Sequence, residues 1–116
     1  MRELYSSFAE VRFIDRDAII QNLRAVVAKA KSCYPEIAKV FLFGSFVRGD
    51  WTADSDADLI VVVDKEFPDV LARSRYQIHC VSIPTDTLVY SEAEFRQLAA
   101  DPGSFLSQNL SLSMEL

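Results

Sequence analysis

Four polar residues near the middle of the chain have types and a spacing suited to phosphate and metal chemistry. Gly44 and Ser45 directly follow one apolar run, and Asp56 and Asp58 open the next. Side chains two residues apart on a strand project to the same face, so these two carboxylates would lie close together and repel each other. A hard divalent cation such as Mg²⁺ removes this repulsion because it prefers oxygen ligands. Asp56 and Asp58 are therefore predicted metal ligands.

The residues after the first apolar run predict a phosphate site. Gly44 permits a tight turn that brings backbone amides close to a ligand. If a helix begins at Ser45, its free amides and the positive end of its dipole attract an anion, and the Ser45 hydroxyl adds a donor. Arg48 lies one helical turn further on. It either contacts a phosphate or pairs with Asp50 or Asp54.

A phosphate site beside a metal pair predicts transfer of a phosphoryl or nucleotidyl group. Two metal ions about 3.5–4 Å apart clamp the attacking and leaving oxygens of such an in-line displacement, and two ions usually require a third carboxylate. Asp86 opens the run "DTLVY" and is the natural supplier if that strand lies beside 58–63. Asp86 would act there as a metal ligand, or as the base that takes the proton of an acceptor hydroxyl.

Each of these residues also has an ordinary structural interpretation. Asp56 and Asp58 would suit a solvated acidic loop, and Gly44 and Ser45 would suit a strand-end turn followed by a helix cap. Asp86 would be a charge at a strand edge. The combination of the glycine-serine pair with the two acids at this spacing favours the chemical interpretation.

The elements that must position these residues form a small α/β domain. Apolar residues spaced three and four apart predict a helix over 15–33. Ser91, with Glu94 three residues later, forms a capping box before a further helix. We expect one domain over 1–116, a small mixed β-sheet flanked by helices. Its remaining parts are a core motif at 38–63 with strands at 38–43 and 58–63, a short helix at 69–76, one long or two short strands around Pro84 (76–83 and 85–90), and a helical tail at 91–112.

Composition excludes several other classes. The chain has 116 residues, half of them hydrophobic, and a formal net charge of −5 without a basic cluster, so direct nucleic-acid binding is not expected. No apolar run is long enough to span a membrane, and the start lacks the features of a signal peptide. The two cysteines are far apart and do not suggest zinc. A cytoplasmic location is expected. The apolar tail from Phe105 to Leu112 is a candidate partner surface.

The segment "FLFGSFVRGDWTADSDADLIVVV" resembles the minimal nucleotidyltransferases of the DNA polymerase beta-like superfamily. It carries their signature of Gly-Ser, ten intervening residues, and Asp-x-Asp, here Gly44-Ser45 and Asp56-Ala57-Asp58. The later segment "TDTLVYSEAEF" is similar to the family strand that opens with a third acid, which places Asp86 at that acid. The resemblance spans roughly residues 37 to 98.

The resemblance implies an activity and a partner. Relatives bind an NTP, often ATP, with Mg²⁺, and transfer its nucleoside monophosphate to a hydroxyl. Many pair with an all-helical HEPN protein in toxin–antitoxin modules, in which the nucleotidyltransferase is the antitoxin and transfers AMP to a toxin tyrosine. A hetero-oligomer with such a protein is thus expected. Two alternatives stay open: an inactive antitoxin that neutralises its partner by contact, and a small-molecule transferase of the aminoglycoside type.

Overall fold

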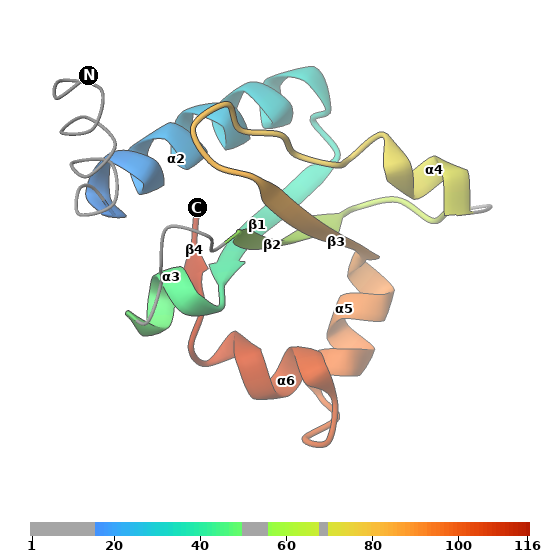
Figure 1. Ribbon diagram of the computed structural model, residues 1–116. Coiled ribbons are helices and arrows are strands. Elements are labelled where there is room, and N and C mark those ends of the chain that lie inside the picture. Colours follow the sequence, from blue (N-terminus) through green and yellow to red (C-terminus); the bar gives the residue numbers. More distant parts are fainter. Residues whose placement is uncertain (1–15, 50–55, 68–69) are drawn as a thin grey trace, which may run out of the picture.

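The computed structural model describes residues 16–49, 56–67 and 70–116 (Figure 1). In these ranges the chain forms a four-stranded sheet in the order β3-β2-β1-β4. Strand β2 runs antiparallel to β1 and parallel to β3, and β4 pairs antiparallel with β1. The predicted mixed sheet is therefore confirmed. The strands are β1 (Ile37–Phe43), β2 (Ala57–Val63), β3 (Thr85–Ser91) and β4 (Met114–Glu115).

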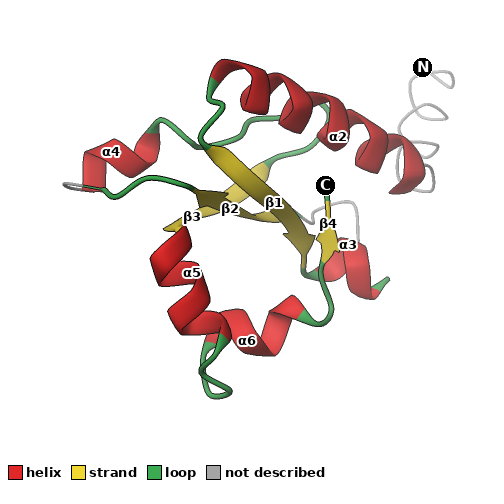
Figure 2. Cartoon of the chain, turned by 180° about the vertical axis from the view of Figure 1, so that it is seen from behind, coloured by secondary structure: helices red, strands yellow, loops and turns green. Residues whose placement is uncertain are grey.

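Helices cover both faces of the sheet. Helix α2 (Arg16–Cys33) lies on one face and buries Ile20, Leu23 and Val27 against it. Helices α5 (Glu92–Ala99) and α6 (Phe105–Leu110) lie on the opposite face, as the two views in Figures 1 and 2 show. Because β2 is central and covered on both faces, six of its seven residues are buried, as its β-branched sequence predicts. The remaining one is Asp58, which is half-buried.

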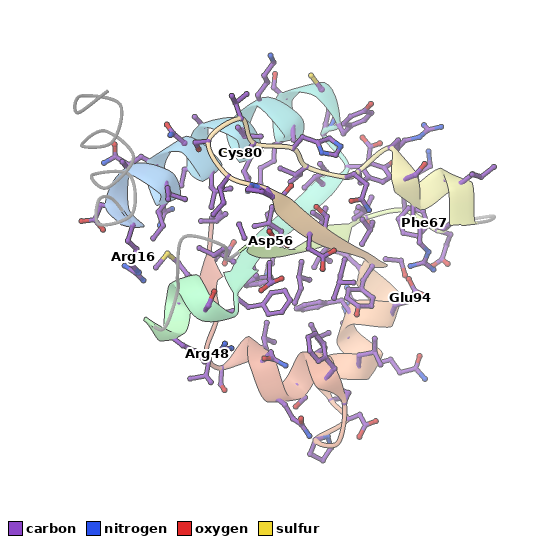
Figure 3. All side chains as sticks on the ribbon, viewed as in Figure 1. Arg16, Arg48, Asp56, Phe67, Cys80 and Glu94 are labelled. Atoms are coloured by element: carbon purple, nitrogen blue, oxygen red, sulfur yellow. The ribbon has the colours of Figure 1, made fainter. Side chains whose placement is uncertain are left out.

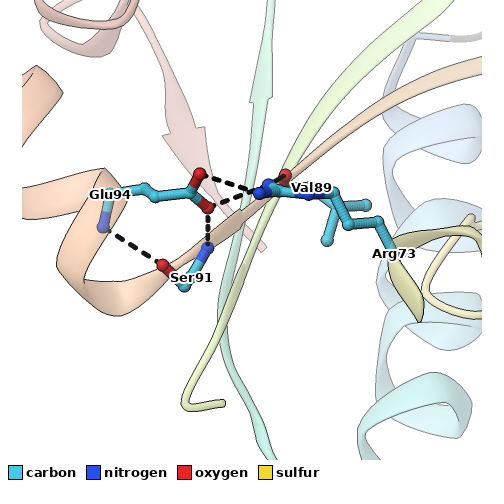
Figure 4. A network of polar contacts seen from close by, with 4 residues as sticks. All are labelled: Arg73, Val89, Ser91 and Glu94. Atoms are coloured by element: carbon cyan, nitrogen blue, oxygen red, sulfur yellow. Dashed lines mark hydrogen bonds and ion pairs between the residues drawn. The ribbon is translucent and has the colours of Figure 1, made fainter. Parts of the chain in front are cut away.

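A polar clamp holds α5 to the sheet. Ser91 accepts a bond from the Glu94 amide at 3.2 Å, and the Glu94 carboxylate accepts one from the Ser91 amide at 2.9 Å, so the predicted capping box is confirmed. Arg73 of α4 (Val70–Ser74) donates to both Glu94 carboxylate oxygens at 2.8 Å and to the Val89 carbonyl at 2.9 Å (Figure 4). This network joins α4, β3 and α5 at the end of β3.

The predicted strand over 76–83 is wrong. The segment forms a turn and an irregular stretch that packs Tyr76, Ile78 and Ile83 into the core on the α2 side. Side chains replace a strand ladder here: the Ile78 amide donates to Thr87 Oγ1 at 3.3 Å, and Thr85 Oγ1 donates to the Ile78 carbonyl. A run of buried apolar residues therefore looks like a strand in the sequence, because it does not reveal which partners the backbone hydrogen bonds have.

The C-terminal segment is only partly the exposed tail that was expected. The predicted last helix is present as α6, but Leu106 is only 1% exposed and lies in the core beneath the sheet. Phe105 and Leu112 are exposed by 53% and 55%. After α6 the chain returns to the sheet as β4, which the sequence did not predict. Among the described residues, no helix is both long and apolar enough to cross a membrane.

Candidate active site

Two of the three predicted acids lie side by side at one end of the sheet. Asp58 and Asp86 are direct register partners on the parallel strands β2 and β3. Partners on neighbouring strands share a face, and both side chains line one pocket. The expectation that the strand of Asp86 lies beside that of Asp58 is therefore confirmed. Asp86 is exposed, whereas Asp58 is half-buried.

Crowding of like charges perturbs Asp58. Partial burial raises the pKa of its carboxyl above the ordinary value, and the negative charges of Asp86 and Asp56 raise it further. The positive charge of Arg48 opposes this effect. The negative charge of an ionised Asp58 is thus only partly compensated in the folded protein. A cation bound among these acids would compensate it.

Gly44 is required at its position for two reasons. Its φ of +84° lies in the left-handed region that side chains disfavour. In addition, a Cβ on Gly44 would lie 2.3 Å from Oδ2 of Asp58, closer than any van der Waals contact. The Asp58 carboxylate therefore sits directly over the backbone of Gly44, because Phe43 and Asp58 are register partners across β1 and β2. The glycine and the second acid of the signature are in contact.

The predicted helix after Gly44 is a single turn, α3 (Ser45–Arg48). The amides of Val47 and Arg48 donate to the Gly44 carbonyl at 3.1 and 3.0 Å. Within the described residues, the backbone bonds around α3 leave the Ser45 amide without a carbonyl acceptor. Ser45 and Arg48 line the same pocket as the two acids. The residues predicted to hold phosphate are thus gathered beside the predicted metal ligands.

Asp56 occupies a different position from the other two acids. It is exposed and lies just before β2, at the same end of the sheet as α3 and Arg48 (Figure 3). Over the ranges that the structure describes, no three His, Cys, Asp or Glu side chains are grouped closely enough to form a metal site. The metal-binding role of the three acids stays a prediction, as do the ion pairs of Arg48 with Asp50 or Asp54, which lie outside the described residues.

The donor set nevertheless fits a hard cation. Every candidate ligand is a carboxylate oxygen, which is the ligand type that Mg²⁺ selects. Partial burial is the main cause of the raised pKa of Asp58, and the neighbouring negative charges of Asp86 and Asp56 add to it; a bound divalent cation would compensate the charge that both effects disfavour. The pocket itself has a volume of about 320 Å³, within the range of small-ligand sites, and opens to solvent.

Sequence reasoning missed one wall of the pocket. Phe105 and Asn109 of α6 line it opposite α3, together with Leu88 of β3 and Phe43 of β1. Phe105 contacts Phe43 edge to face, with ring centroids 5.7 Å apart. Residues four apart share a helix face, so the sequence does indicate that Phe105 and Asn109 act together. It does not indicate which part of the fold they face.

A glycine turn under a carboxylate, a second carboxylate on the adjacent parallel strand, and a mixed sheet covered by helices define a nucleotidyltransferase of the DNA polymerase beta-like class. Comparison with known proteins agrees. The family model of the nucleotidyltransferase domain matches residues 22–109, so the chain belongs to this family.

Two relatives support this assignment. The chain is 30% identical, over 83 residues, to a Methanocaldococcus jannaschii protein named "Putative protein adenylyltransferase MJ0604"; the match covers 72% of this chain and 80% of that protein. The fold is similar to the crystal structure of a putative nucleotidyltransferase from Sulfolobus solfataricus, with a TM-score of 0.57 and 25% identity over 78% of this chain and 79% of the other.

Proposed function

We propose that this nucleotidyltransferase transfers AMP from ATP to a hydroxyl of a protein, with Mg²⁺ as cofactor, and that its acceptor is a HEPN-type partner that it neutralises as an antitoxin. The observation that carries the proposal is the alignment of Asp58 with Asp86 directly beside Gly44. The name of the Methanocaldococcus jannaschii relative, a putative protein adenylyltransferase, supports transfer of AMP to a protein.

Each residue has a distinct role in this reaction. The amide and hydroxyl of Ser45 would bind the phosphates, and Arg48 would add a positive charge near them. Asp56, Asp58 and Asp86 would hold Mg²⁺, which supplies charge neutralisation for the triphosphate. Gly44 lets the chain pass beneath the Asp58 carboxylate without steric conflict.

The transfer step needs one base and little other chemistry from the protein. The acceptor oxygen attacks the α-phosphorus, the bond from that phosphorus to the bridging oxygen breaks, and pyrophosphate leaves. Asp86 is exposed at the open side of the pocket, where it can accept the proton of the incoming hydroxyl. Positioning and charge compensation supply most of the acceleration in such reactions.

The test is incubation of the protein with ATP labelled at the α-phosphate, Mg²⁺ and the product of the neighbouring gene. Label should appear on that partner, and Asp58→Asn should remove it. Asp64→Asn is the matched control, since Asp64 is an exposed acid beyond the other end of β2. If the double variant Asp56→Asn/Asp58→Asn no longer labels the partner but still neutralises it, neutralisation occurs by contact. If label passes to aminoglycosides and not to the partner, the acceptor is a small molecule.

A further inference from the structure

The pocket has two chemically different halves. Gly44, Ser45, Arg48 and the two acids form a polar half, and an aromatic and aliphatic half faces it. Leu88 and Phe105 are exposed by 36% and 53%, so large apolar surface is left open beside charged groups. A nucleotide has the same division, with an anionic triphosphate at one end and an apolar base at the other.

We infer that α6 is the base-binding wall of this pocket, on which Phe105 stacks the purine and Asn109 selects adenine. The inference rests on the proposed function, because it assigns the base end of the same nucleotide. It adds the two residues that would hold the base and give the site its preference for adenine.

The wall is held in place by the fold. Ser104 caps α6 by accepting a bond from the Ser107 amide at 3.0 Å, and its hydroxyl donates to the Leu98 carbonyl of α5 at 2.5 Å. Leu106 anchors the helix in the core. The contact with Phe43 fixes the ring of Phe105 while half of its surface stays open. A ring held in this way can stack on a base without losing much conformational freedom.

The orientation of the Asn109 amide determines which base it can recognise. Its Nδ2 donates to the carbonyl of Phe105 at 2.8 Å. A carbonyl only accepts, so the nitrogen must face it, and this leaves Oδ1 and the second hydrogen of Nδ2 to contact a base. Adenine offers an amino donor at its exocyclic position, whereas guanine offers an oxygen there. On the edge that carries this group and N7, adenine can therefore donate to Oδ1 and accept from the second hydrogen of Nδ2, whereas guanine presents two acceptors and leaves Oδ1 without a donor. Cytosine also has an amino donor, but its smaller ring stacks less.

Nucleotide binding without any acceptor tests this assignment. Dissociation constants for ATP, GTP, CTP and inorganic tripolyphosphate are measured by calorimetry with Mg²⁺ present. The wild-type protein should bind ATP most tightly, then CTP, then GTP. Phe105→Ala should weaken ATP and GTP by about tenfold each, as expected for loss of a stacking partner, and leave tripolyphosphate unchanged. Asn109→Leu should weaken ATP about tenfold and weaken GTP clearly less.

Matched controls separate the wall from general surface effects. Leu112 is as exposed as Phe105 and does not line the pocket, so Leu112→Ala should bind every ligand like the wild type. Gln108→Leu makes the same kind of change as Asn109→Leu at an exposed position one residue earlier. Thermal melts confirm that each variant is folded.

The outcomes distinguish the two levels of the argument. The base-binding wall is wrong if ATP binds but neither Phe105→Ala nor Asn109→Leu changes its dissociation constant. It is also wrong if Asn109→Leu weakens ATP and GTP binding equally. In both cases the proposed function stands. If the folded wild-type protein binds neither nucleotides nor tripolyphosphate, both the proposed function and the base-binding role of α6 are wrong.

Discussion

Replacing Asp58 by Asn should stabilise the metal-free protein while it removes transferase activity. The Asp58 carboxyl is half-buried beside Asp86 and Asp56, and its raised pKa shows that the folded state disfavours its charge. Asn keeps nearly the same shape and removes the charge. The substitution therefore removes a charge that is partly desolvated and is also repelled by the neighbouring acids.

The magnitude follows from the strand spacing. Neighbouring strands lie about 4.8 Å apart, so the charges of register partners are about 5–6 Å apart. With an effective dielectric between about 20 and 80, Coulomb's law gives roughly 0.7–3 kcal/mol for such a pair. The open pocket favours the lower part of this range, and Arg48 offsets some of the repulsion. We expect about 1 kcal/mol, which raises the Tm of a domain of this size by about 3–6 °C.

Thermal unfolding with EDTA, repeated at several pH values, measures the effect. Because the folded-state pKa of Asp58 is raised, the wild-type protein gains stability as pH falls through that pKa. The advantage of Asp58→Asn should therefore be largest near pH 7 and shrink as pH falls toward 3.8, the ordinary value for this carboxyl.

Under the proposed metal role, magnesium should reverse the order, since binding to these acids would stabilise the wild-type protein more than the variant. Asp64→Asn removes one exposed negative charge away from the pocket and should change the Tm little. A variant no more stable than the wild type at pH 7 in EDTA would refute the argument from crowded charges, provided that Asp64→Asn also leaves the Tm unchanged.

Three further predictions concern the frame of the site. Gly44→Ala should destabilise the protein by about 1–2 kcal/mol through its positive φ and weaken Mg²⁺ binding by displacing the Asp58 carboxylate, as denaturation and a metal titration would measure. Glu94→Gln should reduce the loss of unfolding free energy that the protein shows as pH falls below 4.5. The bonds from Arg73 lower the pKa of Glu94 from 4.5 to about 2, so the stability they provide is present above pH 4.5 and lost as pH falls toward 2. Since the Glu94 side chain is 40% exposed, the difference should be about 1 kcal/mol after screening. Leu106→Ala should cost about 2–4 kcal/mol in urea denaturation and release α6 from the core.

The acids of the site were predictable because local patterns determine them. The β-branched run after Asp58 marks a central strand, and the run after Asp86 resembles a neighbouring one. Two neighbouring parallel strands begin at the same edge of a sheet, so acids at their starts meet once the strands are adjacent, a condition that the sequence leaves open and the structure shows to be met. The glycine-serine turn is local in the same sense. The contact between Gly44 and Asp58 depends in addition on how β1 and β2 are aligned, and the sequence does not reveal this alignment.

The apolar wall could not be predicted because it depends on packing between distant segments. Residues 91–112 indicate helices, and α5 and α6 are present. The bond from Ser104 to the Leu98 carbonyl and the burial of Leu106 hold α6 against α5 and the sheet, and Phe105 of α6 lines the pocket. In the sequence alone, an exposed phenylalanine near the end of a chain is equally consistent with a partner surface. The error over 76–83 has the same origin, since burial there comes without strand pairing.

The contact between Gly44 and Asp58 follows from the register of β1 on β2. Phe43 pairs with Asp58, so Gly44, the next residue, passes beneath the carboxylate. The same register sends Leu59 toward α2 and Asp58 toward α6. A slip of one residue would exchange these faces and bury a charged carboxylate against α2, which costs several kcal/mol. Hydrophobic burial along β2 thus also determines the face on which the Asp58 carboxylate lies. Gly44 leaves the space that this carboxylate occupies.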